Sequence, residues 1–111
     1  MLKLEIKLDD GKINKDKKYQ IDSVYKTMEQ YFTRFGLRTE YMNDGTVFFY
    51  GNGKRQDYGA FGSGITSLRE QDWFMEYVVR WIWYNSNDGE DENDFSVEDV
   101  LFHYTRKESV A

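Results

Sequence analysis

Residues 2–8 read Leu-Lys-Leu-Glu-Ile-Lys-Leu, so that aliphatic and charged side chains alternate along the chain. An alternation with a period of two places the aliphatic side chains on one face of a strand and the charged side chains on the other. The segment therefore predicts a strand with one buried and one solvated face. The polar stretch that follows, 9–18, is rich in Lys and Asp and is predicted to be a solvated connection.

Beyond this connection, apolar and aromatic residues recur at steps of three and four between Ile21 and Phe35. This spacing is typical of an amphipathic helix that buries one face. Asp22 is suited to the N-cap and Gly36 to a left-handed residue that ends the helix. We therefore predict a helix over 22–35.

A β-hairpin is predicted next, because the apolar segments 37–42 and 46–50 flank the turn sequence Asn43-Asp44-Gly45. Gly51-Asn52-Gly53 forms a second turn signal. Residues 54–61 are then predicted to be a third strand of the same meander.

A long aromatic helix is predicted over 68–84, after a loose, glycine-rich segment at 59–64. Ser67 and Glu70 have the spacing of a capping box at its start. From Trp73 onward nearly every position is apolar or aromatic. A helix that is hydrophobic on almost every side lies in the centre of a core or forms half of an interface.

The chain closes with a polar, acidic connector at 85–95 and a short helix predicted over 97–107, which Ser96 and Asp99 would cap. The expected order of elements is β-α-β-β-(β)-α-α. It predicts a single α+β domain over 1–111, with a small antiparallel sheet of three to four strands packed against the long helix and one or two further helices.

The sequence offers few groups for catalysis, because it contains no cysteine and only one histidine, His103. There is no thiol nucleophile, and a zinc site needs more ligands of this kind. The glycine spacing at 59–64 does not match a dinucleotide-binding loop. We expect no enzymatic activity, cofactor or metal, and we expect His103 to border a packed helix face.

The N-terminal segment contains no apolar leader, and the most apolar stretch, 73–84, is interrupted by Glu76 and Arg80. A membrane-spanning helix needs about 20 apolar residues. We therefore expect a cytoplasmic protein without membrane contact.

The charge distribution is strongly asymmetric. Residues 1–55 carry 11 basic and 8 acidic side chains, whereas residues 56–111 carry 4 basic and 12 acidic ones. Seven acids and no basic residue fall within 88–99: Asp88, Glu90, Asp91, Glu92, Asp94, Glu98 and Asp99. Such a block is interpreted as a solvated loop, as a surface for a basic partner, or as a divalent-cation site that lacks the calcium-loop pattern.

The hypothesis we favour is a small acidic protein-interaction module that engages a basic, nucleic-acid-binding surface of a partner protein. Residues 88–99 would supply the charge, and Trp73, Trp81 and the hairpin tyrosines would supply apolar anchors. Small acidic α+β proteins of this kind are typical of regulators and inhibitors carried by phages and mobile elements, including mimics of nucleic acid.

Two alternatives stay open. The first is a structural protein that forms a homodimer through the aromatic helix, because large rings are enriched at interface cores. The second is a single-stranded nucleic-acid binder that stacks bases on the aromatics of 46–50, which point to both faces of their strand. The acidity of the chain disfavours nucleic acid, because phosphate contacts dominate its affinity.

Overall fold

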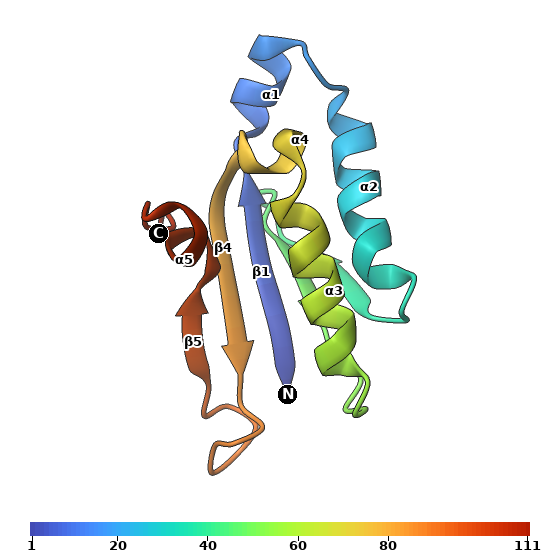
Figure 1. Ribbon diagram of the computed structural model, residues 1–111, viewed down its shortest axis with the longest axis vertical. Helices are drawn as coiled ribbons and strands as arrows, with labels where there is room; N and C mark the ends of the chain where they lie inside the picture. The colour runs from blue at the N-terminus through green and yellow to red at the C-terminus, as the bar shows by residue number, and fades with distance from the viewer.

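A computed structural model describes residues 1–111 as a five-stranded antiparallel sheet with five helices (Figure 1). The spatial order of the strands is β2-β3-β1-β4-β5. The strands are β1 (Leu2–Leu8), β2 (Arg38–Tyr41), β3 (Val47–Tyr50), β4 (Val78–Asn85) and β5 (Ser96–Asp99). The helices are α1 (Asp10–Asp16), α2 (Ile21–Thr33), α3 (Asp57–Arg69), α4 (Asp72–Met75) and α5 (Val100–Thr105). The mixture of helices with an antiparallel sheet is as predicted, but the sheet has more strands than the three to four expected.

The alternating segment forms β1, which is the central strand and pairs antiparallel with β3 and β4. Its four aliphatic side chains are at most 3% exposed and belong to the core. Lys3, Glu5 and Lys7 point to the other face of the sheet. The prediction for this strand is confirmed, and it sets the two faces of the whole sheet.

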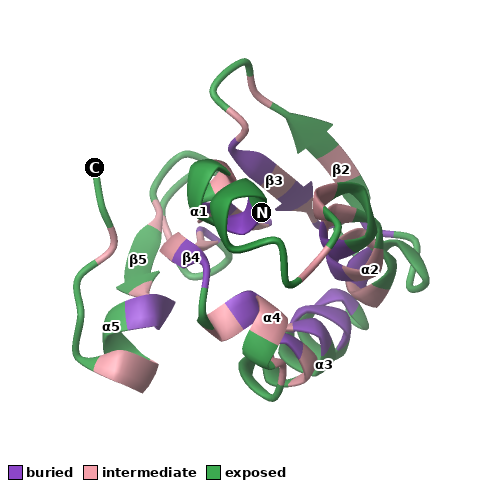
Figure 2. Cartoon of the chain, turned by 90° about the horizontal axis from the view of Figure 1, so that it is seen from above, coloured by how far each residue is buried: buried purple, intermediate pink, exposed green.

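Helices α2, α3 and α4 lie on one side of the sheet, as Figure 2 shows from the end of β1. The core between the layers is aromatic, with Phe32 of α2 stacked on Phe49 of β3 at 4.3 Å between ring centroids. Gly64 of α3 faces the same ring, and a Cβ atom added there would lie 2.2 Å from Phe32. The two helices therefore approach each other at a position that only glycine allows.

The predictions for α2 and the hairpin are confirmed to within a few residues. Helix α2 ends at Thr33, and Gly36 lies in the turn that follows with a φ of +83°. Asp22 as the N-cap is wrong, because Gln20 occupies that position and Asp22 lies in the first turn. Gly45 turns the hairpin with a φ of +88°. The connection predicted at 9–18 contains a short helix, α1. Asp9 caps its start, and Ile13 is the helix residue that is buried.

The predicted helix over 68–84 is wrong. The chain leaves α3 at Arg69, makes the single turn of α4, and then forms β4. Residues 78–84 are mainly β-branched and aromatic, which favours a strand, and β4 pairs with β1 along its length. Arg80 consequently pairs with Glu5 of β1, and not with Glu76 as a helix would require.

The strand predicted over 54–61 and the loose segment over 59–64 are also wrong, because residues 57–64 lie within α3. The buried carboxylate of Asp57 accepts hydrogen bonds from the backbone N–H groups of Asn52 and Lys54, which fixes the turn before the helix. Glycines disfavour a helix by about 1 kcal/mol each, so packing against α2 outweighs propensity here. Ser67 lies near the end of α3 and caps nothing.

The C-terminal helix is shorter than predicted. Residues 96–99 form the edge strand β5, and α5 covers only Val100–Thr105 with Asp99 as its N-cap. The tail returns to the sheet, where the backbone N–H of Val110 donates to the carbonyl of Val79. None of the five helices combines the length and apolar character that a membrane crossing requires.

Candidate protein-interaction surface

The side of the sheet opposite α2 and α3 carries no helix (Figure 2). We call this side the open face. The strand register places on it charged and apolar side chains from every strand. The central ones are Lys3, Glu5, Lys7, Phe48, Tyr50, Arg80, Ile82 and Tyr84, all of them partly exposed. An uncovered sheet face with several large rings is a candidate for binding, because soluble proteins rarely expose contiguous apolar patches without a function.

Lys3 organises the rings at the centre of the open face. Its Nζ lies 4.8 Å from the ring centroid of Tyr84, 4.7 Å from that of Phe95 and 5.7 Å from that of Phe48. Tyr84 and Phe95 also meet edge to face, with centroids 5.8 Å apart. A cation over aromatic faces is attracted by the ring quadrupole, so Lys3 joins three chain segments into one cluster.

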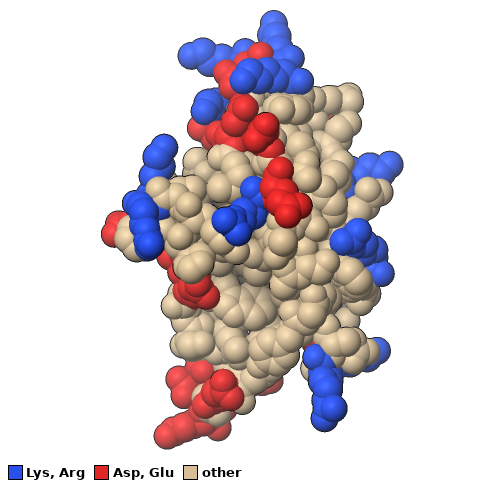
Figure 3. Space-filling model, in the orientation of Figure 1, with Lys and Arg blue, Asp and Glu red and all other residues tan.

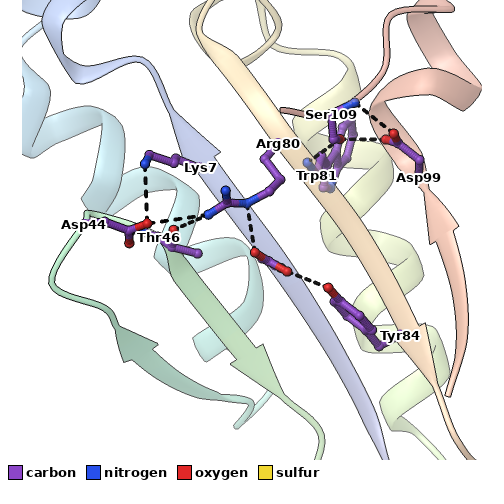
Figure 4. Close-up of polar contacts among 9 residues, drawn as sticks. Lys7, Asp44, Thr46, Arg80, Trp81, Tyr84, Asp99 and Ser109 are labelled. Carbon is purple, nitrogen blue, oxygen red and sulfur yellow. Dashed lines mark hydrogen bonds and ion pairs between the residues drawn. The ribbon is translucent and has the colours of Figure 1, made fainter. Parts of the chain in front are cut away.

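A polar network occupies the part of the open face beside the hairpin turn (Figure 4). The Nε atom of Arg80 lies 2.8 Å from Glu5, and its guanidinium also contacts Asp44 at 3.8 Å and donates to the hydroxyl of Thr46. Lys7 pairs with Asp44 at 3.4 Å. The pKa of Asp44 falls to about 2, chiefly because the backbone N–H of Thr46 donates to its carboxylate. The cations here are neutralised within the protein.

Tyr84 connects this network to the aromatic cluster. Its hydroxyl donates to the carboxylate of Glu5 at 2.6 Å. Burial, followed by the hydrogen bond and the charge of Glu5, raises the pKa of Tyr84 to about 12. Tyr84 therefore stays neutral and fixed in orientation at physiological pH.

The connector between β4 and β5 forms the acidic loop, residues 86–95, whose side chains gather at one end of the molecule (Figure 3). Two of its acids shape the turn: Asp94 accepts from the backbone N–H of Glu90 at 3.0 Å, and Asp91 accepts from that of Asn93 at 2.8 Å. Asp88, Glu90 and Glu92 are exposed. No Lys or Arg pairs with any carboxylate of the loop, so its charge faces solvent.

Two of the predicted site residues have structural roles. Asp99 accepts from the hydroxyl of Ser109 at 2.6 Å and from the backbone N–H groups of Ser109 and Phe102. Burial alone would raise the pKa of Asp99, but these hydrogen bonds lower it overall. Trp81 is fully buried and packs between Phe74 and Tyr104. The prediction that Trp81 anchors a partner is therefore wrong. Asp99 holds the C-terminal tail through Ser109.

The remaining predicted residues lie apart from one another. Trp73 is half-buried beside Tyr31, and its indole N–H donates to Gln71 at 3.1 Å. Glu98 is exposed on β5, where it lies 3.8 Å from the exposed ring of His103. His103, which is a residue of α5, thus faces solvent. No three His, Asp or Glu side chains gather closely enough to hold a metal ion.

The sequence does not predict Phe95 as a surface ring, because this residue falls in the polar connector at 85–95. It predicts Tyr84 as a surface ring only on the seam of a helix over 68–84, and not on a sheet face. The charged residues of β1 are the sequence signal for such rings. A strand that pairs with β1 must place some of its own side chains beside Lys3 and Glu5. The alternation in β3 is as expected, with Val47 and Phe49 buried and Phe48 and Tyr50 on the open face.

No protein-family model, characterised protein or solved structure matches this chain. Its function is therefore inferred from its own surface.

Proposed function

We propose that this protein is a small acidic interaction module that binds a partner protein through the acidic loop and the adjoining open face. The observation that carries the proposal is the position of Phe95. This residue belongs to the acidic loop, yet its ring packs against Tyr84 and Lys3 on the open face. Exposed negative charge and partly exposed rings therefore form one continuous surface, which is the combination of rim and apolar centre found in protein interfaces.

The partner we propose carries a basic surface, of the kind that binds nucleic acid. The net charge of the chain is -5, and the acidic loop would attract such a surface and speed association at low salt. An inhibitor that occupies a nucleic-acid-binding site works in this way. The phage or mobile-element setting of such regulators belongs to the same proposal.

Direct binding of nucleic acid is less favoured by the same geometry. Lys3 already lies over the rings on which bases would stack, and Arg80 and Lys7 are paired with acids. Few cations remain on the open face for phosphates, which dominate nucleic-acid affinity.

Self-association through a long aromatic helix is not favoured, because residues 68–84 do not form one helix. The rings expected at the seam of that helix are Trp73, Phe74, Tyr77, Trp81 and Tyr84. Phe74, Tyr77 and Trp81 are at most 1% exposed, whereas Trp73 and Tyr84 are partly exposed but lie on α4 and β4. A homodimer would have to use another surface.

The test is affinity capture from a nuclease-treated lysate of the source cell at low and moderate salt. The loop variant carries Asp88→Asn, Glu90→Gln and Glu92→Gln, which leaves the turn-forming Asp91 and Asp94 intact. The control variant removes the same charge elsewhere, at exposed acids without hydrogen-bond partners: Asp22→Asn, Glu70→Gln and Glu108→Gln.

We expect a basic protein that the wild type and the control retain and that the loop variant loses. The purified partner should then bind more weakly to Phe48→Ser and Tyr50→Ser than to the wild type in a direct titration. Equal capture by all three proteins, or binding that salt does not weaken, would contradict the proposal.

A further inference from the structure

The helix-covered side of the sheet has a groove of about 260 Å³ between α3 and α5. Trp83 of β4 lies in the groove with Phe61 and Ile65 of α3 and Tyr104 of α5. Trp83 and Phe61 meet edge to face, with centroids 4.9 Å apart. These apolar side chains belong to the core or pack against it, while the polar side chains of Glu98 and His103 also line the groove.

The groove exists because the helical layer is incomplete. Helices α2 and α3 pack against each other and contact β2 and β1, whereas α5 has only six residues and packs beside β4. Ser96 and Glu98 of β5 share a sheet face with the partly exposed Trp83 through the strand register, and both stay exposed. One further helix would continue the layer over β4 and β5.

We infer that this groove docks an amphipathic helix of a partner protein, with Lys or Arg at the end that lies beside the acidic loop. A helix fits this groove better than an extended segment, because one wall of the groove is the side of helix α3. Gly62 of α3 lines the groove, and a Cβ atom added there would meet no atom within 4 Å. A second helix can thus approach α3 to the 8–10 Å that is usual for packed helices.

The charges at the two ends of the groove determine in which direction the docked helix would lie. At one end, the hydroxyl of Tyr58 accepts from the side chain of Asn87 at 2.9 Å, which brings the start of the acidic loop beside the groove. Glu98 also lines the groove. At the far end of α3, the guanidinium of Arg69 lies 4.6 Å from the ring centroid of Tyr104. A helix with cations at one end and acids at the other complements both ends.

The groove and the open face are on opposite sides of the sheet, so mutations separate them. Gly62→Leu would fill the groove, whereas Gly59→Leu adds the same side chain to the same helix at a residue that does not line the groove. Both glycines are exposed and have open space at the Cβ position. Because leucine is the better helix former, both variants are expected to fold, which amide spectra will verify.

The probe is a synthetic amphipathic helix about four turns long, with leucines along one face, lysines at one end and glutamates at the other. Binding is followed by amide chemical shifts of the whole protein. We expect shifts confined to α3, β4, β5 and α5, a loss of affinity of about tenfold or more in Gly62→Leu, and little change in Gly59→Leu.

The second measurement tests how the charge of Glu98 contributes to the affinity for the peptide. Glu98→Lys should weaken the peptide several-fold, and it should leave a matched peptide with glutamine in place of every charge unaffected. Equal affinities for the two leucine variants, shifts on the open face, or no binding at low salt would each overturn the inference. The titration of Phe48→Ser and Tyr50→Ser with the captured partner tests the open face alone, so the two proposals can fail separately.

Discussion

The ammonium group of Lys3 lies 4.7 Å from the ring centroid of Phe95, so the first strand of the chain holds a residue of the acidic loop against the sheet. The same ammonium group contacts Tyr84, on the neighbouring strand. The loop is therefore attached to the open face at its C-terminal end, and its charge has a fixed position relative to the sheet.

We expect Phe95→Ala to release this attachment. The loss of the ring contacts should reduce the free energy of unfolding by about 1 kcal/mol. It should also raise the rate of amide hydrogen exchange within 86–95 more than elsewhere. Asn93→Ala serves as the control, because Asn93 is an exposed residue of the same loop and only its backbone N–H takes part in a hydrogen bond. Unchanged exchange in the loop would show that Phe95 does not anchor it.

Gly64 should be intolerant of any side chain. The Cβ atom of Gly64→Ala would lie 2.2 Å from Phe32, so the two helices must separate, which typically costs about 1–3 kcal/mol. Gly62→Ala on the same helix has open space and should stabilise the protein by up to about 1 kcal/mol. Denaturant midpoints of the two variants give the comparison, and a neutral Gly64→Ala would mean a looser contact between α2 and α3.

Asp99→Ala should destabilise α5 and the C-terminal tail together. The loss of an N-cap costs about 1 kcal/mol, and the hydrogen bonds from Ser109 are lost with it. Because the pKa of Asp99 is lowered in the folded protein, its contribution is complete above the unfolded pKa near 3.8 and disappears as the pH falls further. Stability curves of Asp99→Ala and the wild type should therefore converge in acid. Glu98→Ala should change stability little.

The Tyr84–Glu5 hydrogen bond predicts a specific response to alkali. The pKa of Tyr84 is about 12 in the folded protein, against about 10 unfolded. A raised pKa contributes stability that is complete below pH 10 and is lost as the pH rises towards 12. Tyr84→Phe should remove one late step from the phenolate absorbance titration. A titration identical to that of the wild type would place the late step on another tyrosine.

The sequence predicts those elements whose signals are local. The alternation in β1, the spacing in α2 and the turn at Gly45 are each contained within a short segment and agree with the structure. The segment that became β4 carries apolar side chains towards both faces, because Trp81 and Trp83 face the helices while Ile82 and Tyr84 face outward. That arrangement hides the period of two on which a strand assignment depends.

The rest depends on contacts between distant residues. Helix α3 contains three glycines and reads as a loop. The contact with Phe32 explains Gly64, whereas Gly59 and Gly62 have open space at the Cβ position. The acidic residues of the surface were predicted, since charge is visible in the sequence. Its aromatic part was predicted only for the hairpin strand β3, because the positions of Tyr84 and Phe95 follow from the register of β1 against β4.

The place of β1 in the sheet also governs how the chain can fold during synthesis. β1 precedes in sequence both of the strands that flank it, and these two strands end at residues 50 and 85. Until the second neighbour arrives, one edge of β1 remains unpaired, which is a template for aggregation. Pairing across so long an intervening segment is slow compared with forming local helices. The unpaired edge of β1 must therefore stay shielded until β4 has been made.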